Sequence, residues 1–419
     1  MLRTDTHSLC HLLNLPTDGV TNIAFSGVGT DTRQALNGQL FVALTGENFN
    51  GADFIEAAEA AGAVAAIVNK PVNSTLPTLV VPDTLAALTT LAQHHLQQIK
   101  PMVIGITGSN GKTTVKNLLN HMLSLQAPTL ATRGNLNNHI GVPLTLLELE
   151  DQHQYAIIEM GANHLGEIAH LREIAKPDIA LVTNTGDAHI GEFGGFENLV
   201  KAKGEIYSSY SQNIVNTQTT FMGDLSFGEG GDIFASDIGG NQFQLHVGDQ
   251  SVQVTIQLIG RHNIDNALAA SACAHALGLS IEQIKQGLEA TPAEPGRLKL
   301  IQAGEMRLID DSYNANPASI KAAIKTLGEF SGEHVIVLGQ MAELGEDSDK
   351  LHTEVSQVAH ASSDAFYSFG NNTEAYQTQH FNDAQALADH LLSQHGQATI
   401  LFKGSRIAKL EQIITKITV

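Results

Sequence analysis

The sequence predicts an α/β protein built from three domains. Its 419 residues are too many for one ordinary hydrophobic core, so two or three domains are expected. Short, fully apolar runs alternate with amphipathic helical segments, a pattern typical of parallel sheets covered by helices. One apolar run leads into a glycine-rich loop that carries a Gly-Lys-Thr triplet, which indicates a nucleotide-binding domain.

The first domain is expected over residues 1–100. The run QLFVAL (39–44) predicts a strand, residues 53–63 a helix and VAAIVN (64–69) the next strand. The segment TLPTLVVPD predicts a further strand, and TLAALTTLAQHHLQQ a helix that ends at IKP. We therefore expect a domain boundary near Pro101.

The second domain is expected over residues 101–297. Its apolar runs MVIGIT, YAIIEM and DIALVTNT predict buried strands of a doubly wound parallel sheet, which binds ligands at the carboxyl ends of its strands. Residues 211–259 are rich in glycine and in β-forming residues, and we interpret them as a short β excursion. Helical periodicity returns over residues 263–290.

The third domain is expected over residues 298–419. The linker segment TPAEPGRLKL precedes it, and MRLIDD, HVIVLG, AFYSFG and ATILFKG then predict four strands separated by helical stretches. This alternation predicts a Rossmann-like α/β domain of ordinary size.

Composition excludes several classes of function. Acidic residues outnumber basic residues 43 to 23, so the net charge is −20, and a nucleic-acid partner is not expected. Two cysteines do not make a disulfide framework, which favours a cytoplasmic location. No run approaches the length of a membrane helix, so membrane insertion is not expected, and we expect a monomer.

The stretch GITGSNGKTT (105–114) departs from the strict phosphate-loop pattern, because Ile106 stands where that pattern has its first glycine. A glycine-rich turn that merely caps a helix is the alternative. The strand before the loop and the amphipathic helix after it favour a phosphate site, with Lys112 at the β- and γ-phosphates and Thr113 on Mg²⁺. The residues expected to bind ATP here are Gly108, Ser109, Asn110, Gly111, Lys112, Thr113 and Thr114.

The loop TGSNGKTT resembles that of the Mur ligases and their relatives the folylpolyglutamate synthases, which form amide bonds with ATP. The resemblance implies metal ligands and catalytic groups beyond the loop. Glu159 ends one predicted strand and His189 follows another. Alone they could be a helix N-terminal residue and a solvated loop residue, but the family places a metal-binding glutamate and histidine there. Lys203 matches the lysine that is carbamylated in several members of the family, and Lys201 is the less favoured candidate for this modification. A protonated amine cannot bind Mg²⁺, whereas its carbamate is an anionic oxygen ligand.

The resemblance also implies further ATP contacts. GRHNIDNALAA is similar to the family segment that meets adenine, so Asn263 and Asn266 are assigned to ATP, with helix N-capping as the alternative. Arg297, at the junction of the second and third domains, and Asp311, at a strand end, are implied to meet the phosphates and the ribose.

Several segments are close to the family version that adds D-alanyl-D-alanine to a UDP-N-acetylmuramoyl-tripeptide. They are residues 132–147, 157–171, 310–324, 338–352 and 401–406. The resemblance therefore implies an ATP-dependent ligase with these two substrates, with Mg²⁺, and with an acyl-phosphate intermediate. The residues implied to contact the substrates are Asp31, Thr32, Arg33, Asn135, Asn137, Asn138, Asn163, Asn314 and Asn316.

Two other interpretations remain open. A folylpolyglutamate synthase-like ligase would share the loop but would not need a UDP-binding first domain. A non-catalytic ATP-binding module could sense a cell-wall precursor through closure of its domains. A GTPase or kinase is disfavoured, because the third α/β domain has no role in either.

Overall fold

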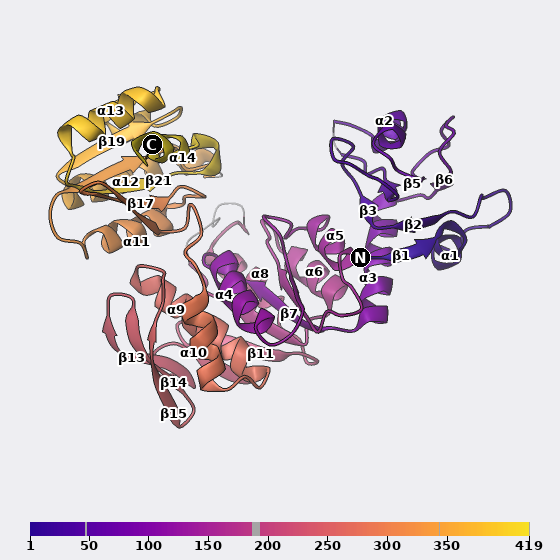
Figure 1. Cartoon of the computed structure of the whole chain (residues 1–419), viewed down its shortest axis with the longest axis horizontal. Coiled ribbons are helices and arrows are strands. Elements are labelled where there is room, and N and C mark those ends of the chain that lie inside the picture. Colours follow the sequence, from indigo (N-terminus) through magenta and orange to yellow (C-terminus); the bar gives the residue numbers. More distant parts are fainter. Residues whose placement is uncertain (47, 187–192, 343, 419) are drawn as a thin grey trace.

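The computed structural model describes residues 1–46, 48–186, 193–342 and 344–418. Figure 1 shows a central α/β part that lies between an N-terminal and a C-terminal part. Helices and sheets occur in each part, so the predicted α/β class is confirmed.

The N-terminal part holds a small parallel sheet in the order β3-β4-β5-β6 and an antiparallel pair, β1-β2. The predicted strands at 39–44 and 64–69 correspond to β4 and β5. The strands are β1 (Arg3–Asp5), β2 (Ala24–Ser26), β3 (Val28–Gly29), β4 (Leu40–Val42), β5 (Ala65–Val68) and β6 (Thr78–Val80). The helices are α1 (Thr6–Leu12), the 3₁₀ turn η1 (Gly51–Phe54), α2 (Ile55–Ala60) and α3 (Thr84–Ile99).

Helix α3 joins the N-terminal part to the central part. Asp83 caps its start by accepting hydrogen bonds from two backbone N–H groups, and Lys100 ends it in a left-handed conformation with φ of 52°. Its apolar face packs on α5 and α6 and shares one hydrophobic core with Val142, Leu146 and Leu171. The division of the chain near Pro101 stays a prediction, because this core runs across it.

The central sheet has, in the described part of the chain, nine strands in the order β15-β14-β13-β12-β11-β10-β7-β9-β8. Strands β14 and β15 run antiparallel to their neighbours, and the remaining neighbours pair in parallel. The strands are β7 (Met102–Thr107), β8 (Thr129–Ala131), β9 (Tyr155–Glu159), β10 (Ile179–Val182), β11 (Gln212–Asn216), β12 (Leu225–Phe227), β13 (Ile233–Gly239), β14 (Gln242–Val247) and β15 (Gln250–Thr255).

Helices cover both faces of this sheet, as a doubly wound fold requires. Along β7 the side chains alternate: Val103 lies in the core under α3, α5 and α6, whereas Ile104 and Ile106 lie in the core under α4, α9 and α10. The helices are α4 (Lys112–Ser124), α5 (Gly141–Leu147), α6 (Glu167–Ala175), α8 (Phe196–Gly204), α9 (Arg261–Ala276) and α10 (Ile281–Ala290).

The predicted β character of residues 211–259 is confirmed, but these residues are not an excursion from the central sheet. Strands β11 to β15 continue the central sheet, and Ile214, Phe227, Ile233 and Phe243 are buried in the same core as α9. The sequence did not show this, because glycine-rich turns interrupt the strands. The apolar side chains of these strands join the core only because α9 packs over them.

The C-terminal part holds a sheet in the order β16-β17-β21-β18-β19-β20; among its described strands, β16 is antiparallel to its neighbour and the others pair in parallel. The four predicted strands correspond to β17, β18, β19 and β21. The strands are β16 (Lys299–Ala303), β17 (Met306–Asp311), β18 (His334–Leu338), β19 (Ala365–Phe369), β20 (Gln379–Phe381) and β21 (Thr399–Lys403). The helices are α11 (Pro317–Leu327), η2 (Gly345–Asp347), α12 (Ser348–Ser362), η3 (Glu374–Tyr376), α13 (Ala384–Gln394), η4 (Arg406–Ala408) and α14 (Glu411–Thr418).

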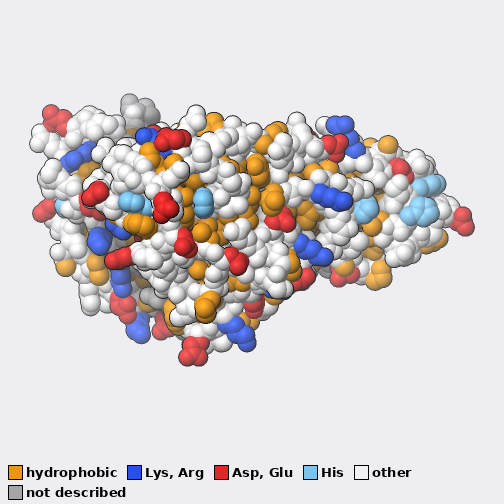
Figure 2. Space-filling model, turned by 90° about the horizontal axis from the view of Figure 1, so that it is seen from below, with side chains coloured by type: hydrophobic (Ala, Val, Ile, Leu, Met, Phe, Trp, Pro, Cys, Tyr) orange, Lys and Arg blue, Asp and Glu red, His pale blue; other side chains and the backbone are white. Residues whose placement is uncertain are grey.

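The surface has a mixed charge. On the face drawn in Figure 2, lysine and arginine side chains stand among aspartate and glutamate side chains instead of forming a continuous basic stripe. This distribution agrees with the net charge of −20 and disfavours a nucleic-acid groove on that face. Among the described residues, no helix combines the length and the apolar character that crossing a membrane demands.

Candidate active site

A cavity of about 1460 Å³ lies between the central and C-terminal parts, at the carboxyl ends of the strands. It is lined by the loop after β7, by the end of β9 and by the loop after β17. Most of the residues that the sequence nominates line it: Ser109, Asn110, Gly111, Lys112, Thr113, Thr114, Asn135, Asn137, Asn138, Glu159, Asn163, Lys203, Asn263, Asn266, Arg297, Asp311, Asn314 and Asn316.

A few nominated residues lie elsewhere. Asp31, Thr32 and Arg33 lie between β3 and β4 and do not line this cavity; the Asp31 carboxylate instead pairs with the Arg33 guanidinium at 2.8 Å. His189 falls outside the described residues. The roles of these residues stay predictions.

The glycines of the loop after β7 permit close approach of the backbone. Gly108 has φ of +146°, and a Cβ there would lie 2.0 Å from the Thr183 hydroxyl oxygen. Gly111 has φ of +81°, and its Cβ would lie 2.2 Å from the Asn266 amide oxygen. Gly111 is also the N-cap of α4 and has no side chain to bond the first N–H groups of the helix. Those N–H groups are left for an anion at the helix N-terminus.

Two residues that the sequence analysis missed brace the loop. The Asn110 carbonyl accepts hydrogen bonds from the Thr183 hydroxyl at 2.7 Å and from the Asn184 amide at 3.0 Å. The Asn184 amide oxygen accepts from the Asn110 N–H at 3.1 Å. Their signal in the sequence is the polar triplet TNT directly after the apolar residues of β10, at the ligand-binding edge of the sheet.

The Lys112 side chain folds back over this loop. Its ammonium donates to the Gly108 carbonyl at 2.7 Å and to the Ser109 carbonyl at 3.2 Å. Burial lowers the pKa of the Lys112 amine, and the nearby Glu159 carboxylate opposes that shift. The amine is therefore held at the mouth of the loop, beside the start of α4.

Glu159 is the last residue of β9 and is only 3% exposed to solvent, so its carboxylate is buried. It accepts a hydrogen bond from the Thr113 hydroxyl at 2.9 Å and one from the Asn137 amide at 2.9 Å. Among the described residues no Lys or Arg forms a salt bridge with Glu159. A buried carboxylate held only by neutral donors is costly, so this arrangement of oxygen atoms fits a bound cation.

Lys203 lies on α8 with its amine 3.5 Å from the Ala162 carbonyl and 5.1 Å from the centroid of the Phe193 ring. Burial, together with the charge of Lys112, lowers the pKa of the Lys203 amine to about 7. Lys201, on the same helix, is exposed. Lys203 is thus the buried lysine of this pair, and a pKa of about 7 makes a neutral amine available near physiological pH.

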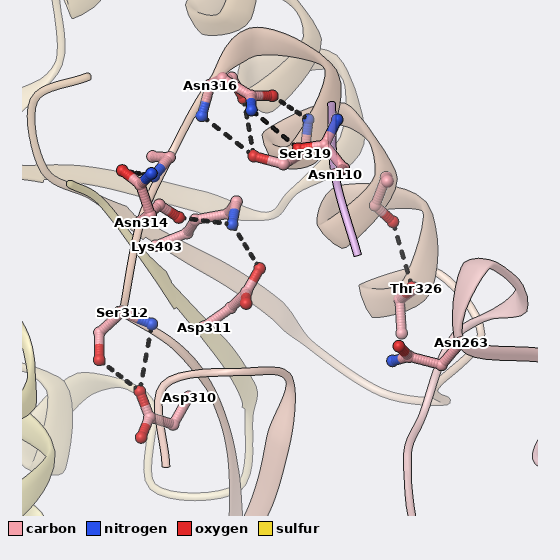
Figure 3. Close-up of polar contacts among 12 residues, drawn as sticks. Asn110, Asn263, Asp310, Asp311, Ser312, Asn314, Asn316, Ser319, Thr326 and Lys403 are labelled. Carbon is pink, nitrogen blue, oxygen red and sulfur yellow. Dashed lines mark hydrogen bonds and ion pairs between the residues drawn. The ribbon is translucent and has the colours of Figure 1, made fainter. Parts of the chain in front are cut away.

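The loop after β17 brings the C-terminal part into the cavity. The Asp311 carboxylate pairs with the Lys403 ammonium at 2.6 Å, and the same ammonium donates to the Asn314 carbonyl at 3.0 Å (Figure 3). Lys403 is 2% exposed and was missed as a site residue, although the segment LFKGSR that contains it carried the resemblance. The pair fixes the loop relative to the end of β21.

A direct contact joins this loop to the loop after β7. The Asn316 amide donates to the Asn110 side-chain oxygen at 2.9 Å across a sequence separation of 206 residues (Figure 3). The Asn316 oxygen caps α11 by accepting from the Ser319 N–H. One asparagine therefore caps a helix of the C-terminal part and touches the glycine-rich loop of the central part.

Arg297 lies at the junction between these two parts. Its guanidinium stacks over the Tyr313 ring at 4.2 Å, and the neighbouring Gly296 N–H donates to the Asp310 carboxylate at 2.8 Å. These contacts hold the junction against β17.

Asn263 and Asn266 lie inside α9, which begins at Arg261 with Gly260 as its N-cap, so the N-capping alternative is wrong. The Asn266 amide donates to the Asn263 oxygen at 3.0 Å. Both side chains are buried, and the Asn266 amide lies beside the loop at Gly111; the implied contact with adenine stays a prediction.

Comparison with known proteins gives consistent matches along the chain. Residues 24–96 match the Mur ligase family catalytic domain, residues 106–274 the Mur ligase middle domain and residues 296–417 the Mur ligase glutamate ligase domain. The UDP-N-acetylmuramoyl-tripeptide–D-alanyl-D-alanine ligase of Escherichia coli K12 is 40% identical over 99% of this chain and 98% of its own length.

Solved structures agree. MurF from Acinetobacter baumannii superposes with a TM-score of 0.93 at 37% identity, and the match covers 100% of this chain and 99% of that one. MurF ligase from Thermotoga maritima, solved in complex with ADP, gives a TM-score of 0.85 at 29% identity over 94% of this chain and 97% of that one. The chain therefore belongs to the Mur ligase family, in the branch of the UDP-N-acetylmuramoyl-tripeptide–D-alanyl-D-alanine ligases.

Proposed function

We propose that this chain uses ATP to join D-alanyl-D-alanine to a UDP-N-acetylmuramoyl-tripeptide, giving the pentapeptide precursor of peptidoglycan, ADP and phosphate. The observation that carries the proposal is that one cavity brings together the glycine-rich loop, the buried Glu159 carboxylate and the Asp311 loop of the C-terminal part. About 300–1,000 Å³ holds one small ligand, so about 1460 Å³ has room for a nucleotide and a peptide side by side.

The nucleotide would lie with its phosphates over the loop after β7. The free N–H groups at the start of α4 would meet the phosphate oxygens, and Lys112 would exchange its two loop carbonyls for the β- and γ-phosphates. Asn263 and Asn266 would lie toward the adenine, and Asp311 and Arg297 toward the ribose and the phosphates.

Magnesium fits the oxygen atoms around Glu159. Thr113, Glu159 and a carbamate on Lys203 would hold it, together with His189, and when bound it would neutralise charge on the phosphates. Apart from the His189 nitrogen, the donors are the oxygen atoms that Mg²⁺ prefers, and Asn137 donates to the Glu159 carboxylate oxygen that Thr113 does not contact.

In the first step, the terminal carboxylate of the tripeptide attacks the γ-phosphorus and ADP leaves, which produces an acyl phosphate. In the second step, the amine of D-alanyl-D-alanine attacks the acyl carbon, loses a proton, and phosphate leaves as the amide forms. The chain's contribution is chiefly positioning and charge: Lys112 stabilises the transferred phosphoryl group, and closure of the junction at Arg297 excludes water from the acyl phosphate.

Substrate contacts follow the walls of the cavity. Asn135, Asn137, Asn138 and Asn163 would face the peptide, and the Asn314–Asn316 segment would face the dipeptide and the nucleotide. Asp31, Thr32 and Arg33 would serve the UDP group from the N-terminal part. A cytoplasmic, monomeric enzyme without a nucleic-acid partner fits these soluble nucleotide substrates.

The test is a screen of amine dependence. Phosphate release from ATP is measured with UDP-N-acetylmuramoyl-tripeptide and a panel of dipeptides, and the product is identified by mass. We expect ADP, phosphate and pentapeptide in equal amounts with D-alanyl-D-alanine. Equal turnover with glutamate and a folate, or ATP binding without any amide product, would replace the proposal with one of the two alternatives.

A further inference from the structure

Lys116 is a buried lysine for which the proposed reaction has no use. It lies on α4, four residues after Lys112, and is 5% exposed. Its ammonium donates a hydrogen bond to the Thr132 carbonyl at 2.7 Å, just beyond β8. Burying a charged lysine costs free energy of folding, so the buried position of the Lys116 ammonium needs a physical explanation.

Thr132 connects this lysine to Glu159. The Thr132 hydroxyl oxygen accepts a hydrogen bond from the Glu159 backbone N–H at 3.0 Å, and the Thr132 N–H donates to the Ile157 carbonyl at 3.0 Å. The backbone continues from Thr132 to Asn137, whose side-chain amide donates a hydrogen bond to the Glu159 carboxylate. Lys116 therefore holds the residue that positions the backbone of Glu159 at the end of β9.

Charge points in the same direction. Burial lowers the pKa of the Lys116 amine, and the Glu159 carboxylate is the foremost group that opposes this shift, ahead of Glu294. The amine thus lies in the field of the carboxylate that lacks a salt bridge of its own among the described residues.

Lys116 and Thr132 also line a second cavity of about 430 Å³, which does not include Glu159 in its wall. Asn117, Asn120, Thr132, Arg133 and Glu148 share its wall. Shortening the Lys116 side chain would therefore open a space that a small molecule can enter from this cavity.

We propose that Lys116 is a positioning residue for the metal site: through Thr132 it fixes the backbone and the carboxylate of Glu159 in the geometry that a divalent cation requires. This inference rests on the proposed function, because it takes Glu159 as a metal ligand. Outer residues of this kind commonly change metal affinity by about 10- to 100-fold when they are replaced.

The primary test measures metal binding without turnover. Mn²⁺ replaces Mg²⁺, and its affinity for the full chain with a non-hydrolysable ATP analogue is measured by electron paramagnetic resonance. Lys116→Met keeps the aliphatic length and removes the ammonium, and we expect it to weaken Mn²⁺ binding roughly 10-fold or more, with metal-free nucleotide affinity unchanged. Asn117→Ala, on the same cavity wall, is the matched control and should bind Mn²⁺ as the parent chain does.

Two further variants make the test decisive. Lys116→Ala should regain Mn²⁺ affinity with added ethylammonium, which can enter from the second cavity. Thr132→Val removes the hydroxyl at constant size and should lose affinity to a similar degree, so the link remains testable even if Lys116→Met does not fold. Parental Mn²⁺ affinity in folded Lys116→Met or in Thr132→Val would overturn the proposal, whereas failure of the parent chain to ligate D-alanyl-D-alanine would instead refute the proposed function.

Discussion

Four lysines at or near the active site have different surroundings: Lys112, Lys203 and Lys403 line the large cavity, and Lys116 lines the second one. Lys112 bonds two carbonyls of the loop, Lys116 one carbonyl beyond β8, and Lys403 a carboxylate and a carbonyl. Lys203 lies 3.5 Å from a carbonyl, and burial lowers its pKa to about 7. The sequence alone does not distinguish the roles of these lysines, because their burial and their hydrogen-bond partners depend on residues far away in the chain.

Replacing Lys112 with alanine should abolish ATP-dependent amide formation. The ammonium is the cationic group at the mouth of the loop, and losing a preorganised stabiliser of transition-state charge costs about 100-fold or more in rate. Steady-state phosphate release checks the rate, and circular dichroism checks that the chain stays folded. Lys201→Ala, at an exposed position, is the control, and normal turnover of Lys112→Ala would reject the assignment of the loop.

At fixed CO₂ pressure, carbamylation of Lys203 should increase as the pH rises, because the amine must be neutral to react and carbamate formation releases a further proton. Only the neutral amine reacts with CO₂, and a pKa of about 7 leaves about nine-tenths of it neutral at pH 8 and about one-tenth at pH 6. At fixed CO₂ pressure, the ¹³C signal of the carbamate should therefore grow as the pH rises from 6 to 8. The signal should vanish in Lys203→Ala and persist in Lys201→Ala; rescue of Lys203→Ala activity by short carboxylates would support the same role.

At the scale of helices and strands, glycine decides how closely elements approach. Gly287, on α10, faces Met122 of α4, and a Cβ at Gly287 would lie 2.7 Å from the Met122 Cα. Backbone atoms cannot retreat without moving the helix. This packing sets the distance between α10 and the helix that begins at the phosphate loop.

Gly287→Ala should therefore destabilise the protein by about 1–3 kcal/mol, the usual cost of overpacking a core. Gly328→Ala is the matched control, because Gly328 has φ of −64° and the nearest atom to its Cβ would be 3.4 Å away. Urea unfolding monitored by circular dichroism compares the two. Equal stability of both variants would contradict the close packing of α4 on α10.

The strands show how far the sequence leads. Fully apolar runs such as MVIGIT and HVIVLG are buried on both faces, and their positions were predicted correctly. Strand β16 alternates half-buried and exposed residues, and β20 is short and mostly exposed, so neither gives a strong local signal. Residues 211–259 were recognised as rich in β-forming residues, but their local pattern does not show that β11 to β15 join the central sheet. The pairs Asn110–Asn316 and Asp311–Lys403 depend on packing between distant segments and could not be predicted from spacing.

At the scale of the whole molecule, the central and C-terminal parts meet through the Asn110–Asn316 contact and the Arg297 junction. Changing one end of that contact should affect nucleotide binding more than folding. Asn316→Ser retains a helix-capping oxygen for α11 but is too short to reach Asn110. This variant therefore removes the contact between the central and C-terminal parts while the N-cap of α11 is kept.

Asn316→Ser should raise the KM for ATP several-fold, since loss of a hydrogen bond worth about 0.5–1.5 kcal/mol shifts an equilibrium by roughly 2- to 13-fold. The thermal midpoint should stay close to that of the parent chain. Steady-state kinetics and thermal unfolding measure both quantities. The double variant with Asn110→Ala should be no worse than Asn110→Ala alone, and additive effects would show that the two side chains act separately.

The core that α3 shares with α5 and α6 determines where this chain can be cut. A fragment that ends near residue 100 would expose the apolar face of α3, so we expect it to aggregate when it is expressed alone. The buried members of the C-terminal cores, in contrast, all come from residue 298 onward. A fragment beginning there carries its own interior, which makes it a candidate for separate spectroscopy and for screening compounds against one side of the cavity.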